Sequence, residues 1–277
     1  MPSSHKIVLL DKGPLKRVLK VRDLFAVGYG DLGSSIYYAL GMTALYALGA
    51  TPIALMLAGL IFACTALTYA EMSSAFPDSG GSASFARHAF NDLISFIAGW
   101  GLLLDYIVTI AISAFAVGPY LDFLSPLFGQ TSIQIGFTVG LIGVLFVINF
   151  LGVKHSTRIS LFLVILTLAT QVLIIILAFA TKFHWGMLRE LQINLPGADF
   201  SPNWSQFWKG TAMAMVAYTG IESIAQLGAE TKEPSKSLPR AAILALFVLL
   251  FMYLGLSMAA LASLPPKELG TTYLNNP

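Results

Sequence analysis

The chain has 277 residues, of which 56% are hydrophobic and only 11% are charged, and its formal net charge at pH 7 is +2. A soluble domain carries about 25% charged residues, so this composition excludes a soluble globular protein. Apolar runs long enough to cross roughly 30 Å of hydrocarbon recur along the chain, which predicts an all-α polytopic membrane protein. Cys64 is the only cysteine, so an intrachain disulfide is excluded.

The hydropathy pattern predicts a tail, two groups of spans and two loops. A basic N-terminal tail occupies 1–21, and a first group of five spans occupies 22–181. A loop over 182–204 leads to two further spans within 205–263, and 264–277 reads as part of another loop. The seven spans are predicted at 22–47, 52–75, 92–121, 132–151, 158–181, 205–230 and 239–263.

The placement of lysine and arginine predicts the orientation of these spans. With a cytoplasmic N-terminus, twelve of the 16 lysine and arginine residues lie in inside segments and four lie outside. We therefore expect a multi-pass protein of the plasma membrane. Its tail would be cytoplasmic, and both 182–204 and 264–277 would be extracellular.

The first span contains a polar interruption. Residues 26–36 read Ala-Val-Gly-Tyr-Gly-Asp-Leu-Gly-Ser-Ser-Ile. A glycine weakens a helix by about 1 kcal/mol relative to alanine, and a carboxylate at membrane depth costs roughly 2.5–3.5 kcal/mol on insertion scales. Two such penalties at one place predict a broken helix that lines a polar cavity.

The sixth span carries a matching interruption at 217–223, which reads Ala-Tyr-Thr-Gly-Ile-Glu-Ser. Interrupted helices at corresponding positions of two halves indicate a transporter binding site. Five spans separate the two breaks, and because five is odd, the second repeat must have the opposite topology. The alternative is that Gly220 only allows two helices to pack closely.

Four motifs resemble those of the amino acid–polyamine–organocation (APC) superfamily of secondary transporters; they lie at 33–36, 76–81, 151–154 and 230–234 together with 239–240. The resemblance implies the LeuT-like fold, a five-plus-five inverted repeat with broken spans one and six. It also implies a permease that imports an amino acid or similar small organic solute with protons, by alternating access. Two five-helix repeats need ten spans, so we expect this chain to be a fragment or an early-terminated product.

The resemblance further implies how the substrate is bound. Backbone N–H groups around Gly33, Ser34 and Ser35 would bind a carboxylate, although Ser35 departs from the family's usual Gly-small-Gly pattern. Free carbonyls near Ala217, Tyr218 and Gly220 would bind the ammonium group. The substrate-binding candidates are Gly30, Gly33, Ser34, Ser35, Ala217, Tyr218, Thr219 and Gly220.

Asp31 supports a second hypothesis, because residues 29–35 also resemble the pattern of KUP-type potassium importers. Asp105 places another carboxylate in the third span, and two carboxylates with nearby hydroxyls suit a proton or a cation. Either acid could instead make only a helix-packing hydrogen bond. Thr167 stands where many proton-coupled relatives carry a lysine, so the acids would have to carry the proton. The coupling candidates are Asp31, Tyr38, Asp105, Tyr106, Thr109 and Glu222.

An intramembrane aspartyl protease is a more remote alternative, suggested by Gly-x-Gly-Asp at 28–31. Those enzymes carry Tyr-Asp on the preceding span, whereas Asp105-Tyr106 is reversed and lies two spans later. We therefore expect no enzyme, no metal and no cofactor beyond a coupling ion, H⁺ with Na⁺ or K⁺ as alternatives. The expected partners are a small-molecule substrate and the lipid bilayer, without nucleic acid, and a homo-oligomer is left open.

Overall fold

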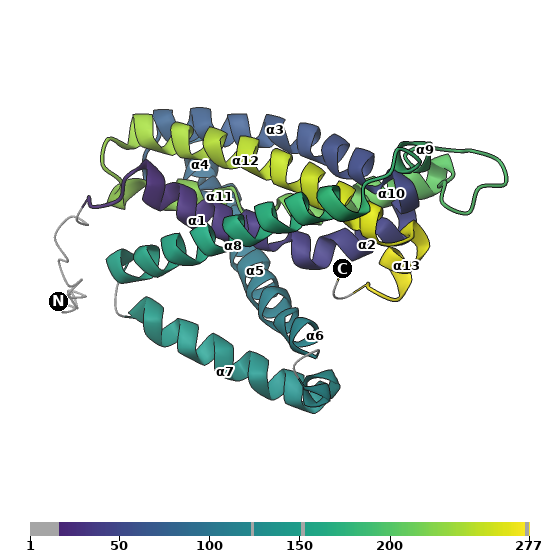
Figure 1. Cartoon of the computed structure of the whole chain (residues 1–277). Coiled ribbons are helices and arrows are strands. Elements are labelled where there is room, and N and C mark those ends of the chain that lie inside the picture. Colours follow the sequence, from purple (N-terminus) through teal and green to yellow (C-terminus); the bar gives the residue numbers. More distant parts are fainter. Residues whose placement is uncertain (1–16, 123–124, 151–152, 275–276) are drawn as a thin grey trace, which may run out of the picture.

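The computed structural model describes residues 17–122, 125–150, 153–274 and 277, and they form helices without a β-strand (Figure 1). The first 16 residues of the predicted tail and residues 151–152 of the third motif lie outside this description. The α-helices are α1 (Val21–Ser34), α2 (Ile36–Ala47), α3 (Thr51–Ala75), α4 (Ser82–Ala89), α5 (Asp92–Phe115), α6 (Val117–Leu121), α7 (Thr131–Phe150), α8 (Val153–Lys182), α9 (Met187–Glu190), α10 (Trp204–Ala214), α11 (Glu222–Gln226), α12 (Pro234–Ser263) and α13 (Pro266–Thr271). Short 3₁₀ turns are η1 (Leu48–Ala50), η2 (Pro126–Gly129), η3 (Met215–Tyr218) and η4 (Gly228–Glu230).

Five helical stretches of the described residues are long and apolar enough to cross a membrane, which confirms the predicted class. They are Val21–Ala75, Asp92–Leu121, Thr131–Phe150, Ser156–Lys182 and Pro234–Ser263. The first stretch holds two of the predicted spans, which meet at the short turn η1 between α2 and α3. The predicted span 205–230 is missing from this set because it is divided into α10, η3, α11 and η4.

The core lies where α1, α3, α8 and α12 run side by side, as Figure 1 shows. Three tyrosines, Tyr29, Tyr218 and Tyr253, are among its largest fully buried side chains. In contrast, α5 and α7 expose most of their apolar side chains, and in Figure 1 α7 lies apart from the bundle. Such surfaces suit contact with lipid tails or with other apolar helices.

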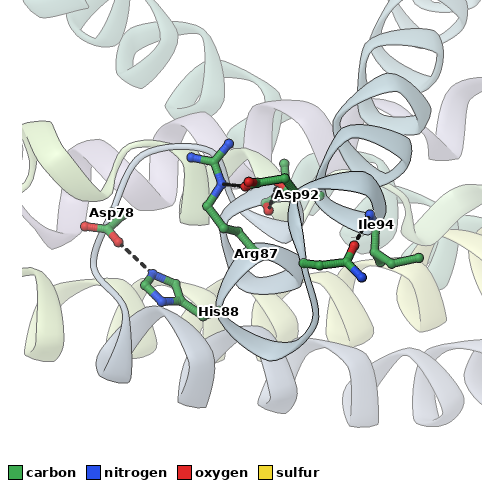
Figure 2. Close-up of polar contacts among 8 residues, drawn as sticks. Asp78, Arg87, His88, Asp92 and Ile94 are labelled. Carbon is green, nitrogen blue, oxygen red and sulfur yellow. Dashed lines mark hydrogen bonds and ion pairs between the residues drawn. The ribbon is translucent and has the colours of Figure 1, made fainter.

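A polar turn fixes the start of α5 against α4 (Figure 2). Asp78 contacts His88 at 3.1 Å, and Arg87 pairs with Asp92 at 3.2 Å. The Asn91 side chain caps α5 by accepting a hydrogen bond from the amide of Ile94 at 3.0 Å. These contacts join the segment around α4 to the start of α5, the helix that carries Asp105 and Tyr106.

The contact between α10 and α2 depends on a residue without a side chain. A Cβ atom at Gly210 would lie 2.6 Å from the Cβ of Ala47 and 2.8 Å from its backbone nitrogen. We expect Gly210→Ala to lower the free energy of unfolding by about 1–3 kcal/mol, because the backbone of α2 must shift. Thermal unfolding of the purified protein in detergent measures this loss.

Gly140→Ala in α7 is the matched control, since nothing lies within 4 Å of a Cβ there. That substitution should leave the unfolding midpoint unchanged or raise it, because alanine favours a helix. Equal midpoints for the two variants would contradict the close packing of α10 on α2.

Candidate functional site

The interruption in span one is a single residue, Ser35, between α1 and α2. Its backbone keeps right-handed helical angles, φ −66° and ψ −22°, and its amide donates to the carbonyl of Leu32 at 3.2 Å. The Ser34 hydroxyl donates to the carbonyl of Asp31 at 2.9 Å, and Tyr38 donates to the Ser35 hydroxyl at 2.8 Å. Polar groups of this segment therefore already have partners, and the break is narrower than the sequence suggested.

The glycines of span one make room for neighbouring side chains rather than unwinding the helix. A Cβ atom at Gly28 would lie 2.4 Å from the side chain of Ile224 in α11, and one at Gly33 would lie 2.6 Å from the ring of Tyr29. Gly30 faces Val164 of α8 at 3.5 Å. Gly28 thus lets α1 approach α11 closely.

Span six is interrupted more strongly. Its first part, α10, begins at a capping box formed by Asn203 and Gln206. The side-chain oxygen of each residue accepts a hydrogen bond from the backbone amide of the other, at 2.8 and 2.9 Å. After η3 the chain becomes extended at Thr219, with φ −75° and ψ 144°. Gly220 then adopts φ +121°, and α11 starts at Glu222. Glycine suits this position because L side chains rarely adopt such angles.

Asp31 of α1 lies directly against this break. A Cβ atom at Gly220 would lie 2.7 Å from the Asp31 Cγ and 2.8 Å from its Oδ2. Ser223, which donates to the Gly220 carbonyl at 2.6 Å, is also close enough to hydrogen-bond the Asp31 carboxyl. The two interrupted spans therefore meet at a carboxyl group.

A second carboxyl contact joins α5 to span six. The side chains of Asp105 and Glu222 are within hydrogen-bonding distance of each other, and both act electrostatically on Asp31. One turn beyond Glu222, the Gln226 amide donates to the Tyr106 hydroxyl at 2.8 Å. Two ionised carboxylates can only accept hydrogen bonds, so a bond between Asp105 and Glu222 requires a proton on one of them.

No basic side chain forms an ion pair with these three acids in the described part of the chain. The ion pairs found there are Arg22–Asp23, Arg87–Asp92, His88–Asp78 and Lys236–Glu233. An unpaired carboxylate in an apolar interior is unfavourable, so protons or a positively charged ligand must neutralise this cluster. The described residues provide no group of three or more His, Cys, Asp or Glu side chains arranged to hold a metal ion.

Two cavities flank span six and divide the predicted residues between them. The smaller, about 480 Å³, is lined by Asp105, Tyr218, Thr219 and Glu222. The larger, about 700 Å³, is mainly apolar and has Tyr38 in its wall. Thr109 lines neither cavity.

Two of the three carbonyls predicted to bind an ammonium group, those of Ala217 and Gly220, already accept a hydrogen bond. The Tyr253 hydroxyl of α12 lies between the carbonyl oxygens of Leu32 and Ala217, 2.8 Å from the latter. The Tyr218 hydroxyl donates to Leu55 at 2.8 Å, so this side chain braces span six against α3. A carbonyl oxygen that accepts one hydrogen bond keeps a second lone pair, so Ala217 and Gly220 can still contact a ligand.

Sequence reasoning missed three polar residues around the site: Gln171, Ser223 and Tyr253. Tyr253 and Gln171 are completely buried in otherwise apolar helices. A polar side chain in a long apolar run was the available signal, because such residues are costly inside a membrane. Ser223 belongs to the predicted interruption itself but was not assigned a role.

A separate cavity of about 410 Å³ lies at the C-terminal end of α12, lined by His184, Glu190, Asp199 and Lys267 among others. Its titratable side chains come from segments outside the candidate spans, whereas Leu261, Ala262 and Ser263 of α12 also line it. Desolvation raises the pKa of the Glu190 carboxyl, and nearby His184 opposes this effect. One oxygen of Glu190 is buried without a hydrogen-bond partner among the described residues.

A family model described as amino acid permease matches residues 19–276, almost the entire chain. The chain belongs to the amino acid permease family. Its relatives include the branched-chain amino acid permease BcaP of Lactococcus lactis, 29% identical over 264 residues that cover 90% of this chain and 57% of the relative. The methylthioribose transporter of Bacillus subtilis is 31% identical over 276 residues, 92% of this chain and 57% of the relative.

The permease and transporter relatives decide against the aspartyl-protease hypothesis, so this family member is not an enzyme. The cationic amino acid transporter 4 of Arabidopsis thaliana, 27% identical, matches 93% of this chain but 45% of its own length. The chain spans about half the length of the curated relatives that it matches.

Gly220→Ala tests the contact between the two interrupted spans. The new Cβ would collide with the Asp31 carboxyl and also impose an unfavourable φ, so we expect a loss of about 2–4 kcal/mol in the free energy of unfolding. Thermal unfolding with and without a chemical denaturant measures the loss.

Gly197→Ala is the control for backbone strain alone, because φ there is +76° and nothing lies within 4 Å of a Cβ. Its loss should be smaller, about 1 kcal/mol. If both variants were destabilised equally, the Asp31–Gly220 contact would contribute nothing.

Proposed function

We propose that this protein is a secondary active transporter of an amino acid or a similar small organic solute. The protein would transport this solute together with protons, by alternating access around spans one and six. The observation that carries it is the meeting of Asp31, Asp105 and Glu222 beside a broken helix, without an ion pair to a described basic residue. The names of the permease and transporter relatives support the same class of solute.

In this proposal Asp105 and Glu222 share the coupled proton, because two neighbouring carboxylates repel each other when both are ionised. Asp31 lies on the other interrupted span and interacts electrostatically with both carboxyl groups. Gain or loss of that proton would change the repulsion between α1, α5 and span six. Protonation and the relative position of the two spans are therefore linked.

The ammonium group of the solute would lie near Asp31 and the second lone pairs of the Ala217 and Gly220 carbonyls. The solute's carboxylate would bind at the Ser34–Ser35 turn, once its hydrogen bonds to the Asp31 and Leu32 carbonyls open. The positive-inside pattern supports a cytoplasmic N-terminus, and import is part of the proposal.

Potassium uptake is the second candidate, because unpaired carboxylates beside the hydroxyls of Tyr38 and Thr219 also suit a cation. One finding weighs against it: Tyr38 belongs to the wall of a different cavity from Asp105.

Uptake of a labelled amino-acid mixture and, separately, of rubidium tests the two candidates in cells that make this chain, with the proton gradient imposed or collapsed. We expect gradient-dependent uptake of amino acids. Asp105→Asn and Glu222→Gln should each reduce the dependence of amino-acid uptake on the proton gradient about tenfold. In each variant a neutral amide, which cannot bind and release the coupled proton, replaces one of the two carboxyl groups. Glu71→Gln, an exposed acid on α3, is the control and should have no effect.

Asp31→Asn separates the candidates. Amino-acid binding by backbone groups should persist in part, whereas potassium transport should be abolished. Rubidium uptake that depends on Asp31 and Asp105, without amino-acid uptake, would replace the first proposal by the second.

A further inference from the structure

Gln171 is a completely buried amide in the middle of the apolar helix α8. Its side-chain oxygen accepts a hydrogen bond from the Tyr29 hydroxyl at 2.7 Å. Its side-chain nitrogen donates to the Tyr37 hydroxyl at 3.5 Å. Both ends of the amide are therefore used, and each end contacts a different tyrosine.

The two tyrosines lie on opposite sides of the interruption in span one. Tyr29 belongs to α1, before Ser35, and Tyr37 belongs to α2, after it. Tyr37 is held further by α6, because the Tyr120 hydroxyl donates to its carbonyl at 2.6 Å. A single side chain of α8 thus connects both halves of the interrupted span.

Such a connection constrains geometry because an amide is short and planar. Its oxygen and nitrogen can reach both hydroxyls at once only over a narrow range of angles between α1 and α2. We propose that Gln171 is a positioning residue that sets the angle between the two halves of span one and thereby holds the site in the conformation seen here. This inference rests on the proposed function in one respect: alternating access is what would require that angle to change.

The position of the contact supports a role beyond packing. A glutamine inside an apolar span is unfavourable unless its hydrogen bonds are satisfied, and a leucine would fill a similar volume without that cost. The Ser35 backbone keeps helical angles, so the Gln171 contacts act together with this turn in setting the angle between α1 and α2. The bond to Tyr37 is the longer of the two, so we expect it to break first when α2 moves.

Cysteine labelling tests the proposal without any substrate. Cys64→Ser removes the only native thiol, and Met42→Cys places a reporter on α2, at a half-exposed residue in the wall of the larger cavity. In this background, Tyr29→Phe and Tyr37→Phe each remove one hydrogen bond to Gln171 and keep the aromatic ring. We expect each to raise the maleimide labelling rate at residue 42 about fivefold or more, because release of either half frees the angle.

The double Tyr29→Phe/Tyr37→Phe variant and Gln171→Leu should show almost the same rate as either single variant, since one broken bond already opens the connection. Thr170→Val is the matched control, because Thr170 is exposed and donates only within α8, to Thr167 at 2.8 Å. It should leave the rate unchanged.

Unchanged labelling in folded Tyr29→Phe and Tyr37→Phe proteins would overturn the proposal, as would small effects that simply add in the double variant. Those results would reduce Gln171 to a packing residue. Labelling does not depend on solute or protons, so this outcome is separate from a failure of amino-acid uptake, which would overturn only the proposed function.

Discussion

The structure depends on how three acidic side chains are accommodated among apolar helices. Asp31, Asp105 and Glu222 come from three helices and meet beside the break in span six. Ionised carboxylates are costly there, and the ion pairs of the described residues lie elsewhere. The requirement for protons or a cationic ligand makes this cluster the place where binding and helix position can be linked.

Close approach between spans one and six makes the cluster possible. Gly28 has no side chain and so leaves space for Ile224 of α11 against α1. Gly220 likewise leaves space for the Asp31 carboxyl. Tyr253 then connects the ends of both interrupted segments through the carbonyls of Leu32 and Ala217. The Tyr253 hydroxyl thus ties α12 to both interrupted segments inside the core.

Span one and span six solve the problem of interruption differently. In span one the hydroxyls of Ser34 and Ser35 bond back to the Asp31 carbonyl, and the helix is interrupted at one residue that keeps helical angles. In span six the extended Thr219 and the positive φ of Gly220 separate two helical pieces. The first break keeps its backbone groups satisfied locally, and the second opens a wall of the smaller cavity.

The sequence by itself determined the membrane class, the helical segments and the two interrupted regions, because apolar runs, glycines and acids are local properties of the chain. It also placed Asp31, Asp105 and Glu222 among the residues of interest. Only the tertiary structure decided that Asp105 and Glu222 form a contact, that Tyr38 belongs to another cavity, and that Gln171 joins α1 to α2. These relations depend on how distant helices cross and rotate against each other, which no single stretch of sequence specifies.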